Sequence, residues 1–149
     1  MSFQPQFQIT PALLARSGLT NRLIGQGLHL HPVTAVAGFF NERVEPWSGN
    51  LQTRHSDQFA NQDEWYGAKF ETGPVHWALP ASAFGWDSPA QHQEDVRRLG
   101  NISVCGILLR DRDTGRVVTA RDGRPRVHYE LSAYDANHLR VAMRGAAEV

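Results

Sequence analysis

Two histidines lie two residues apart in the sequence, at His29 and His31. On a strand they would share one face, and neutral imidazoles are common zinc ligands. A metal site needs further ligands, and none stands at a suitable spacing, although the fold could bring in His55, His76 or His128. We therefore expect no metal site.

The single cysteine, Cys105, lies inside the apolar run 102–109, where a thiolate is disfavoured, so we expect an unreactive thiol. One cysteine also excludes an intramolecular disulfide. Two carboxylates, Glu130 and Asp135, flank an expected helix start, where capping and solvated charge explain them better than acid–base catalysis. The charged run 110–113 alternates in sign and predicts a solvated turn.

An aromatic segment follows His76. Residues 77–87 mix large apolar side chains with glycine and proline and predict a loop or a loose helix. The large side chains could line an apolar channel for an aliphatic chain, because each buried methylene contributes about 0.8 kcal/mol. Core packing, or a surface covered by another part of a larger protein, is the alternative interpretation. The side chains in question are Trp77, Leu79, Phe84 and Trp86.

The elements that must position these residues are short in the first two thirds of the chain. Thr10-Pro11 is typical of a helix start, since threonine caps a helix and the first helical position needs no N–H donor. A second helix is expected from Ser88 to Leu99, on the surface, because it carries few apolar residues. Apolar and β-branched residues predict strands over 32–40, 51–55 and 69–76.

The C-terminal third has the clearest pattern. Strands are expected over 102–110, 116–121 and 126–131, joined by a turn at 113–115 and by a tight hairpin at Asp122-Gly123. Ser132 to Asp135 has the spacing of a capping box and opens a helix. Leu139, Ala142, Met143 and Ala146 form one stripe of that helix and would cover the sheet. The expected fold class is α+β: an antiparallel β-sheet, formed as a meander and backed by helices.

Composition supports one globular unit over residues 1–149. Hydrophobic residues make up 41% and charged residues 20%, and the formal net charge is zero. The balanced charge gives no reason to expect nucleic acid or an anionic membrane as a partner. No apolar run approaches the roughly 20 residues of a membrane span, and the N-terminus has no secretory pattern, so the expected location is cytoplasmic.

Two motifs lie close together, at residues 10–19 (TPALLARSGL) and 24–32 (IGQGLHLHP), and together they resemble a known enzyme family, the glucose–methanol–choline oxidoreductases. Residues 10–19 are similar to its second signature, and residues 24–32 are similar to its Val-Gly-Arg-Asn-Leu-x-x-His-Pro stretch. Residues 29–34, 72–76 and 123–135 resemble its long-chain fatty alcohol oxidase branch. The resemblance covers about residues 9–149. It departs at Gln6, where the family has a small residue, and at Gln26-Gly27, where it has Arg-Asn.

The resemblance implies a flavoenzyme in which FAD takes a hydride from a primary alcohol and a histidine takes the hydroxyl proton. The family's Gly-x-Gly-x-x-Gly loop for FAD does not occur in this sequence. The catalytic histidine segment is expected beyond the end of the chain, so no catalytic residue is assigned. We expect a partial domain, truncated at its front, that forms the substrate-binding lobe and is inactive alone.

The expected partners are an FAD-binding domain of the same or a neighbouring polypeptide and an apolar alcohol. Gly25 and Pro32 are expected near the flavin. The substrate-lining residues are expected to be His31, His76, Trp77, Leu79, Phe84 and Trp86. Two alternatives stay open: a stand-alone, non-catalytic module that binds a small apolar ligand or a partner protein, and a non-functional remnant of a broken gene.

Overall fold

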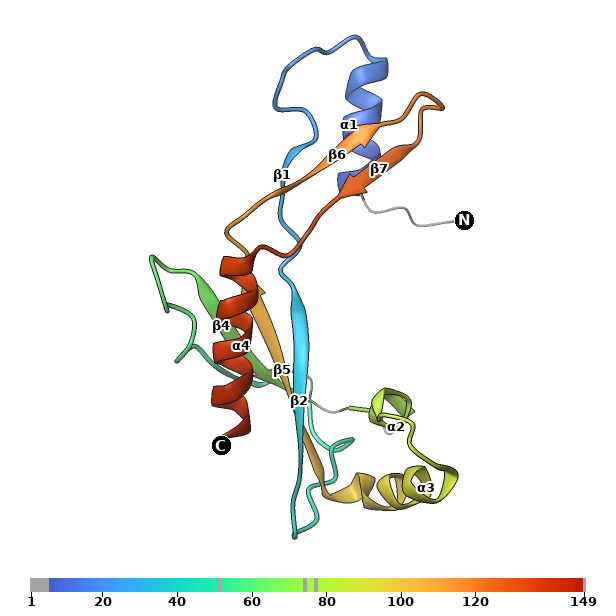
Figure 1. Ribbon diagram of the computed structural model, residues 1–149, viewed down its shortest axis with the longest axis vertical. Coiled ribbons are helices and arrows are strands. Elements are labelled where there is room, and N and C mark those ends of the chain that lie inside the picture. Colours follow the sequence, from blue (N-terminus) through green and yellow to red (C-terminus); the bar gives the residue numbers. More distant parts are fainter. Residues whose placement is uncertain (1–5, 51, 74, 77, 149) are drawn as a thin grey trace.

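The computed structural model describes residues 6–50, 52–73, 75, 76 and 78–148. The molecule is elongated because two antiparallel sheets follow one another along its length (Figure 1). The predicted α+β class is confirmed. The strands of the larger sheet lie in the order β2 (Val33–Phe39), β5 (Ile102–Arg110), β4 (Gly67–Thr72) and β3 (Arg54–Ser56). Those of the smaller sheet are β1 (Gln26–Leu28), β6 (Gly115–Thr119) and β7 (Pro125–His128).

Two long segments run through both sheets. The first continues from β1 into β2 and the second from β5 into β6, and they pair antiparallel in each sheet, with Gln26 opposite Arg116 and Val33 opposite Leu108. The turn predicted at 113–115 is therefore wrong. β6 does not fold back on β5, because β2 and β4 occupy both edges of β5, and the chain passes on into the smaller sheet. The predicted hairpin between β6 and β7 is confirmed.

The helix α4 (Ala133–Ala147) covers one face of the larger sheet. Its Ala142 packs with Ile107 and Leu109 of β5 and Phe70 of β4 to form the main core. Ile107 and Leu109 reach this core because alternate residues of a strand point to the same face. The bounds predicted for β5 are confirmed.

The predicted stripe on α4 is confirmed at three of its four positions. Leu139, Ala142 and Ala146 pack against the core. Met143 instead is 37% exposed. It follows Ala142 by about 100° around the helix, which places it beside the buried stripe.

A second helix, α1 (Gln6–Arg16), packs on β6 and β7 of the smaller sheet. Among the side chains that the structure describes here, the buried apolar ones are Ala12 of α1, Leu28 of β1 and Val117 of β6. The helix begins earlier than predicted, so Pro11 lies inside it rather than at its first position. Helix geometry explains why this is tolerated, since the proline removes a single backbone hydrogen bond near the start of the helix.

The remaining elements lie at the far end of the larger sheet (Figure 1). α2 (Ala78–Ala83) falls within the predicted aromatic segment, and α3 (Pro89–Arg97) is the predicted surface helix. Its predicted cap is confirmed, because the Gln91 N–H donates to Ser88 Oγ at 3.1 Å. The strands predicted over 51–55 and 69–76 are shifted to β3 and β4; Leu51 and Pro74 lie outside the described residues. None of the described helices has the length and apolar character needed to cross a bilayer.

Candidate functional site

The β2 edge of the larger sheet is apolar and open on the face opposite α4, whereas β4 places Lys69 and Glu71 on that face. Strand alternation puts Val33, Ala35, Ala37 and Phe39 of β2 on this face, because Val36 of the same strand packs on the α4 side. Val33 is 60% exposed, and the two alanines are also exposed. Sheets with one face in water normally carry polar residues there. We call this surface the open face.

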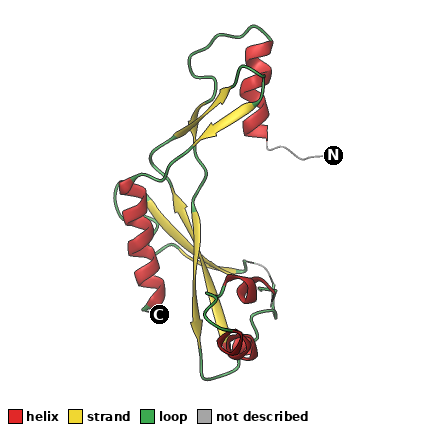
Figure 2. Ribbon diagram, turned by 45° about the vertical axis from the view of Figure 1, so that its right-hand side comes forward, coloured by secondary structure: helices red, strands yellow, loops and turns green. Residues whose placement is uncertain are grey.

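The predicted substrate-lining residues border the two ends of the open face. His31 is an exposed residue just before β2. At the other end of β2, the Phe84 ring lies 5.8 Å from the ring of Phe39. Figure 2 shows α4 on one side of the larger sheet and α2 and α3 on the other. The seven residues of β2 separate the two ends by about 20 Å, so His31 and Phe84 do not share one pocket.

The other predicted lining residues lie on the α2 side. Leu79 is 64% exposed and Trp86 is 69% exposed. The Trp86 ring lies 5.2 Å from the ring of His92 of α3. His76 Nδ1 accepts a hydrogen bond from the Ala78 N–H at 3.3 Å, at the start of α2. Trp77 lies outside the described residues.

Gly25 and Pro32, the two residues expected near a flavin, both make backbone hydrogen bonds to neighbouring strands. Gly25 has φ +77°, and its carbonyl accepts from the Val117 N–H at 2.7 Å. A side chain at Gly25 would run into the Val117 carbonyl. The flavin phosphates would need a glycine loop that leads into a helix, whereas Gly25 leads into β1, so this loop does not fit them. The Pro32 carbonyl accepts from the Leu109 N–H at 2.9 Å.

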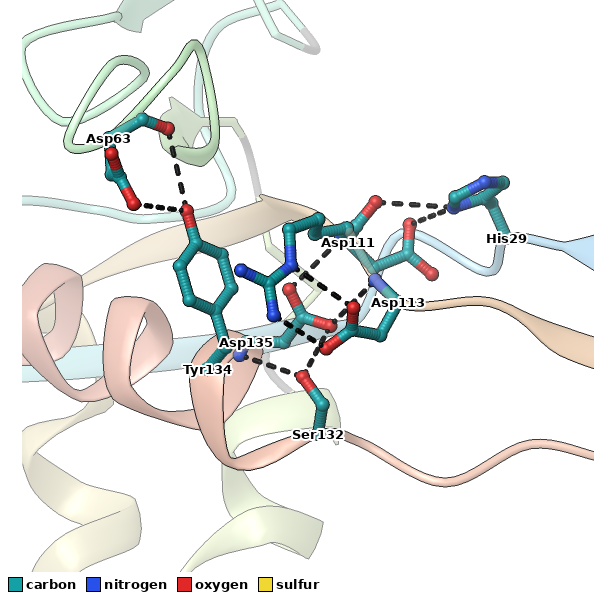
Figure 3. A network of polar contacts seen from close by, with 8 residues as sticks. His29, Asp63, Asp111, Asp113, Ser132, Tyr134 and Asp135 are labelled. Carbon is teal, nitrogen blue, oxygen red and sulfur yellow. Dashed lines mark hydrogen bonds and ion pairs between the residues drawn. The ribbon is translucent and has the colours of Figure 1, made fainter.

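A buried polar network joins the two sheets, where residues 29–32 and 111–114 cross between them (Figure 3). Asp111 is only 5% exposed, so the solvated turn predicted for this run is wrong. Its Oδ2 accepts hydrogen bonds from the Leu30 N–H at 3.0 Å and the Tyr129 hydroxyl at 2.8 Å. His29 Nδ1 lies 3.1 Å from the Asp111 carbonyl and 3.4 Å from its carboxylate Oδ1.

The electrostatics of Asp111 follow from these contacts. Burial alone would raise the pKa of its carboxyl, but the hydrogen bonds from Leu30 and Tyr129, together with nearby His29, outweigh burial and lower that pKa below its ordinary value. Burial and the hydrogen bond to Asp111 raise the pKa of Tyr129. The carboxylate is therefore held ionised at neutral pH, and the tyrosine keeps its proton.

A second buried carboxylate, Asp135, fixes the start of α4. It is 1% exposed and accepts from the Arg112 N–H at 2.9 Å and the Asp113 N–H at 3.3 Å. The predicted capping role is confirmed, because the Asp135 N–H donates to Ser132 Oγ at 3.1 Å and the Ser132 hydroxyl donates to Asp135 Oδ2 at 2.9 Å. The expected solvated charge is wrong, since this carboxylate replaces water as the partner of two backbone N–H groups.

The exposed side of the network is held by Arg112. Its guanidinium lies 3.5 Å from the centre of the Tyr134 ring and donates to both carboxylate oxygens of Asp113 at 3.0 and 3.1 Å. The Tyr134 hydroxyl donates to Asp63 at 2.9 Å, which ties α4 to the loop before β4.

The network is suited to positioning rather than to proton transfer. Its two buried carboxylates are engaged by backbone N–H groups and hydroxyls, and neither is left to accept a proton from a substrate. Within the described part of the chain, no three His, Cys, Asp or Glu residues are grouped as metal ligands. Sequence reasoning named Asp135 as a cap but missed its burial, and it missed the buried role of Asp111. The spacing of Ser132 and Asp135 was a local signal for the first, whereas His29 lies 82 residues from Asp111, so no local pattern indicates the second.

The class of protein follows from its relatives: the chain is homologous to a segment of the glucose–methanol–choline (GMC) oxidoreductases, and the predicted resemblance is confirmed. It is 32% identical over 136 residues to the uncharacterized GMC-type oxidoreductase Rv0492c of Mycobacterium tuberculosis, which covers 91% of this chain and 21% of the relative. The alcohol-oxidising branch is represented by two long-chain-alcohol oxidases of Arabidopsis thaliana. FAO4B is 30% identical over 146 residues and FAO3 is 28% identical over 152 residues, each match covering 95% of this chain and 19% of the relative.

No protein-family model matches the chain. The chain spans about a fifth of the length of the relatives it matches. The activity of those complete proteins therefore bears on this chain only as the basis for a proposal.

Proposed function

We propose that this chain forms a wall of the substrate chamber in an FAD-dependent oxidoreductase that acts on the CH–OH group of long-chain primary alcohols. The FAD and the catalytic histidine would be carried by other parts of the same or a neighbouring polypeptide. Two facts support this proposal: the relatives named long-chain-alcohol oxidases, and the apolar side chains of β2 that the described part of the chain leaves in water on one sheet face.

The open face is the observation that carries the proposal. Its exposed apolar side chains on β2 extend for about 20 Å, from Val33 near His31 to Phe39 beside α2. An aliphatic chain laid along this face would gain about 0.8 kcal/mol for each methylene removed from water. In this proposal the chain excludes water and aligns the alcohol. It does not remove the proton of the alcohol.

The test is a hybrid of the long-chain-alcohol oxidase FAO4B in which the homologous fifth is replaced by this chain. We expect the hybrid to oxidise a long-chain alcohol such as dodecan-1-ol. Ala35→Asp should abolish this activity, because it places a charge on the open face at an exposed position where it costs the chain itself little stability. The matched control is Gln93→Asp on the exposed surface of α3, which should leave the rate unchanged.

Full activity of the Ala35→Asp hybrid would exclude the open face as a chamber wall. A second measurement does not depend on the hybrid: the chain alone is mixed with FAD and dodecan-1-ol. Tight flavin binding and aldehyde formation by the chain alone would refute its passive role.

One feature favours a second candidate, a non-catalytic module for a small apolar ligand. It is an apolar hollow beside the end of α4, on the face of the larger sheet away from the open face.

A further inference from the structure

The hollow beside α4 has a volume of about 720 Å³. Its floor is the sheet beyond the C-terminal end of α4, where Val36, Gly38, Ser103 and Cys105 lie on the same face as the main core. Three of these four residues are small, which makes the floor deep. We call this hollow the trough. Small-molecule pockets are typically about 300–1,000 Å³, so the volume fits a ligand of that class.

The walls of the trough are fixed by packing. The Phe59 ring fits against Gly145 of α4, where any side chain would collide with it, and lies 5.0 Å from the Phe70 ring in a stacked arrangement. On the other side, the Phe40 ring lies over Gly38, 3.4 Å from where a side chain would begin. A preformed apolar site binds with a smaller entropy cost than one that must form around its ligand.

The rim of the trough carries a positive charge. Arg54 lines the trough, and its pairing opposite Thr72 puts it on the same face as the floor. Within the described residues, Arg54 makes no ion pair or side-chain hydrogen bond. The neighbouring carboxylate, Glu71, points to the opposite face and accepts from Gln52 at 2.7 Å.

We propose that the trough binds a linear aliphatic chain that ends in a carboxylate, with the hydrocarbon along the floor and the carboxylate at Arg54. The four strands under the trough span about 14 Å, which suits an extended hydrocarbon. This site is separate from the proposed alcohol chamber, because the sheet lies between the two. The ligand site in the trough does not depend on the proposed function. The two tests probe opposite faces of the larger sheet.

The probe is dodecanoate, used below its micelle-forming concentration and measured by titration calorimetry. We expect it to bind, and affinity to fall about fourfold for each methylene removed from the tail. Dodecyltrimethylammonium has the same tail with the opposite charge and should bind more weakly. Binding should also slow alkylation of Cys105, which is the only cysteine and lines the trough. Burial raises the pKa of this thiol, so alkylation is followed at about pH 9.

Two variants separate the headgroup from the tail. Arg54→Glu should reverse the preference, so that the ammonium amphiphile binds better than dodecanoate. Ser103→Phe should fill the floor and abolish binding of both. Arg97→Glu on α3 makes the same charge change on an exposed surface away from the trough and should leave both affinities unchanged.

The proposal is overturned if dodecanoate does not bind, or if Arg54→Glu leaves the preference between the two amphiphiles unchanged. It is also overturned if Cys105 is already protected without ligand and sedimentation shows a dimer, since the trough is then an interface between copies. Arg54 is exposed, so the Arg54→Glu result stands even if Ser103→Phe fails to fold.

Discussion

Asp111 lies in an alternating run of arginines and aspartates, yet its carboxylate is buried and accepts hydrogen bonds from the Leu30 N–H and the Tyr129 hydroxyl. The pattern of charges in the sequence does not show which charged side chain contacts residues that are distant in sequence. The partners of Asp111 come from the segment before β2 and the segment before α4, and only the packed chain brings them together.

Asp111→Asn should lower the free energy of unfolding by about 2 kcal/mol at pH 7. The variant replaces a charged acceptor by a neutral one, so the hydrogen bonds from the Leu30 N–H and the Tyr129 hydroxyl, which share one oxygen, become weaker. Urea unfolding measures the change. Asp57→Asn, at an exposed position, is the matched control and should change stability by less than about 0.5 kcal/mol.

The same residue predicts a pH dependence. Its pKa is lowered in the folded state, so its stabilisation is complete above the unfolded pKa of about 3.9 and is lost as pH falls through the lower folded value. Wild type should therefore lose more stability than Asp111→Asn between about pH 5 and pH 2. Parallel acid titrations of the two proteins would contradict this assignment.

At the scale of elements, two helices start with a serine cap in different surroundings. Ser88 caps the exposed helix α3 by accepting from the Gln91 N–H. Ser132 caps α4 in the same way and also donates to the buried carboxylate of Asp135. The third residue after the serine is Gln91 in one cap and Asp135 in the other, and the carboxylate of Asp135 is buried because α4 starts at the contact between the sheets.

Ser88→Ala should therefore cost about 0.5–1 kcal/mol, whereas Ser132→Ala should cost about 2 kcal/mol. The larger loss arises because the Asp135 carboxylate keeps its burial and loses one of its hydrogen-bond donors. Thermal unfolding of the two variants in one buffer measures the difference. Equal losses would show that the hydroxyl of Ser132 contributes only its cap.

For the whole molecule, the two sheets differ in how much apolar surface they bury. The larger sheet packs Ile107, Leu109 and Phe70 against α4, whereas among the described side chains the smaller one buries only Leu28 and Val117 under α1. Local opening is easiest where few apolar contacts hold an element. The smaller sheet should thus open more often than the larger one (Figure 1).

Native-state hydrogen exchange should show this directly. Amides in β6 and β7 are expected to exchange at least tenfold faster than amides in the middle of β5, a difference of about 1.4 kcal/mol or more in opening free energy. Equal protection in both sheets would mean that the buried network at Asp111 and Asp135 makes them one cooperative unit.

The sequence by itself determined the local structural features and the family to which the chain is related. The apolar run 102–109 placed β5, Asp122-Gly123 gave the hairpin, and Ser88 and Ser132 gave two caps, because each of these depends on residues within a few positions. The motifs at 10–19 and 24–32 were sufficient to indicate the GMC family, since fixed spacing survives substitution of most other residues.

Only the tertiary structure decided how the strands are shared between two sheets. The β5 edges are filled by β2 and β4, which are distant in sequence, so β6 pairs elsewhere in spite of its local turn signal. The same long-range pairing buries Asp111 and Asp135, places His31 and Phe84 at opposite ends of an open apolar face, and leaves the trough beside α4. Burial and strand order depend on which segments compete for the same edge or face, and that competition involves the whole chain.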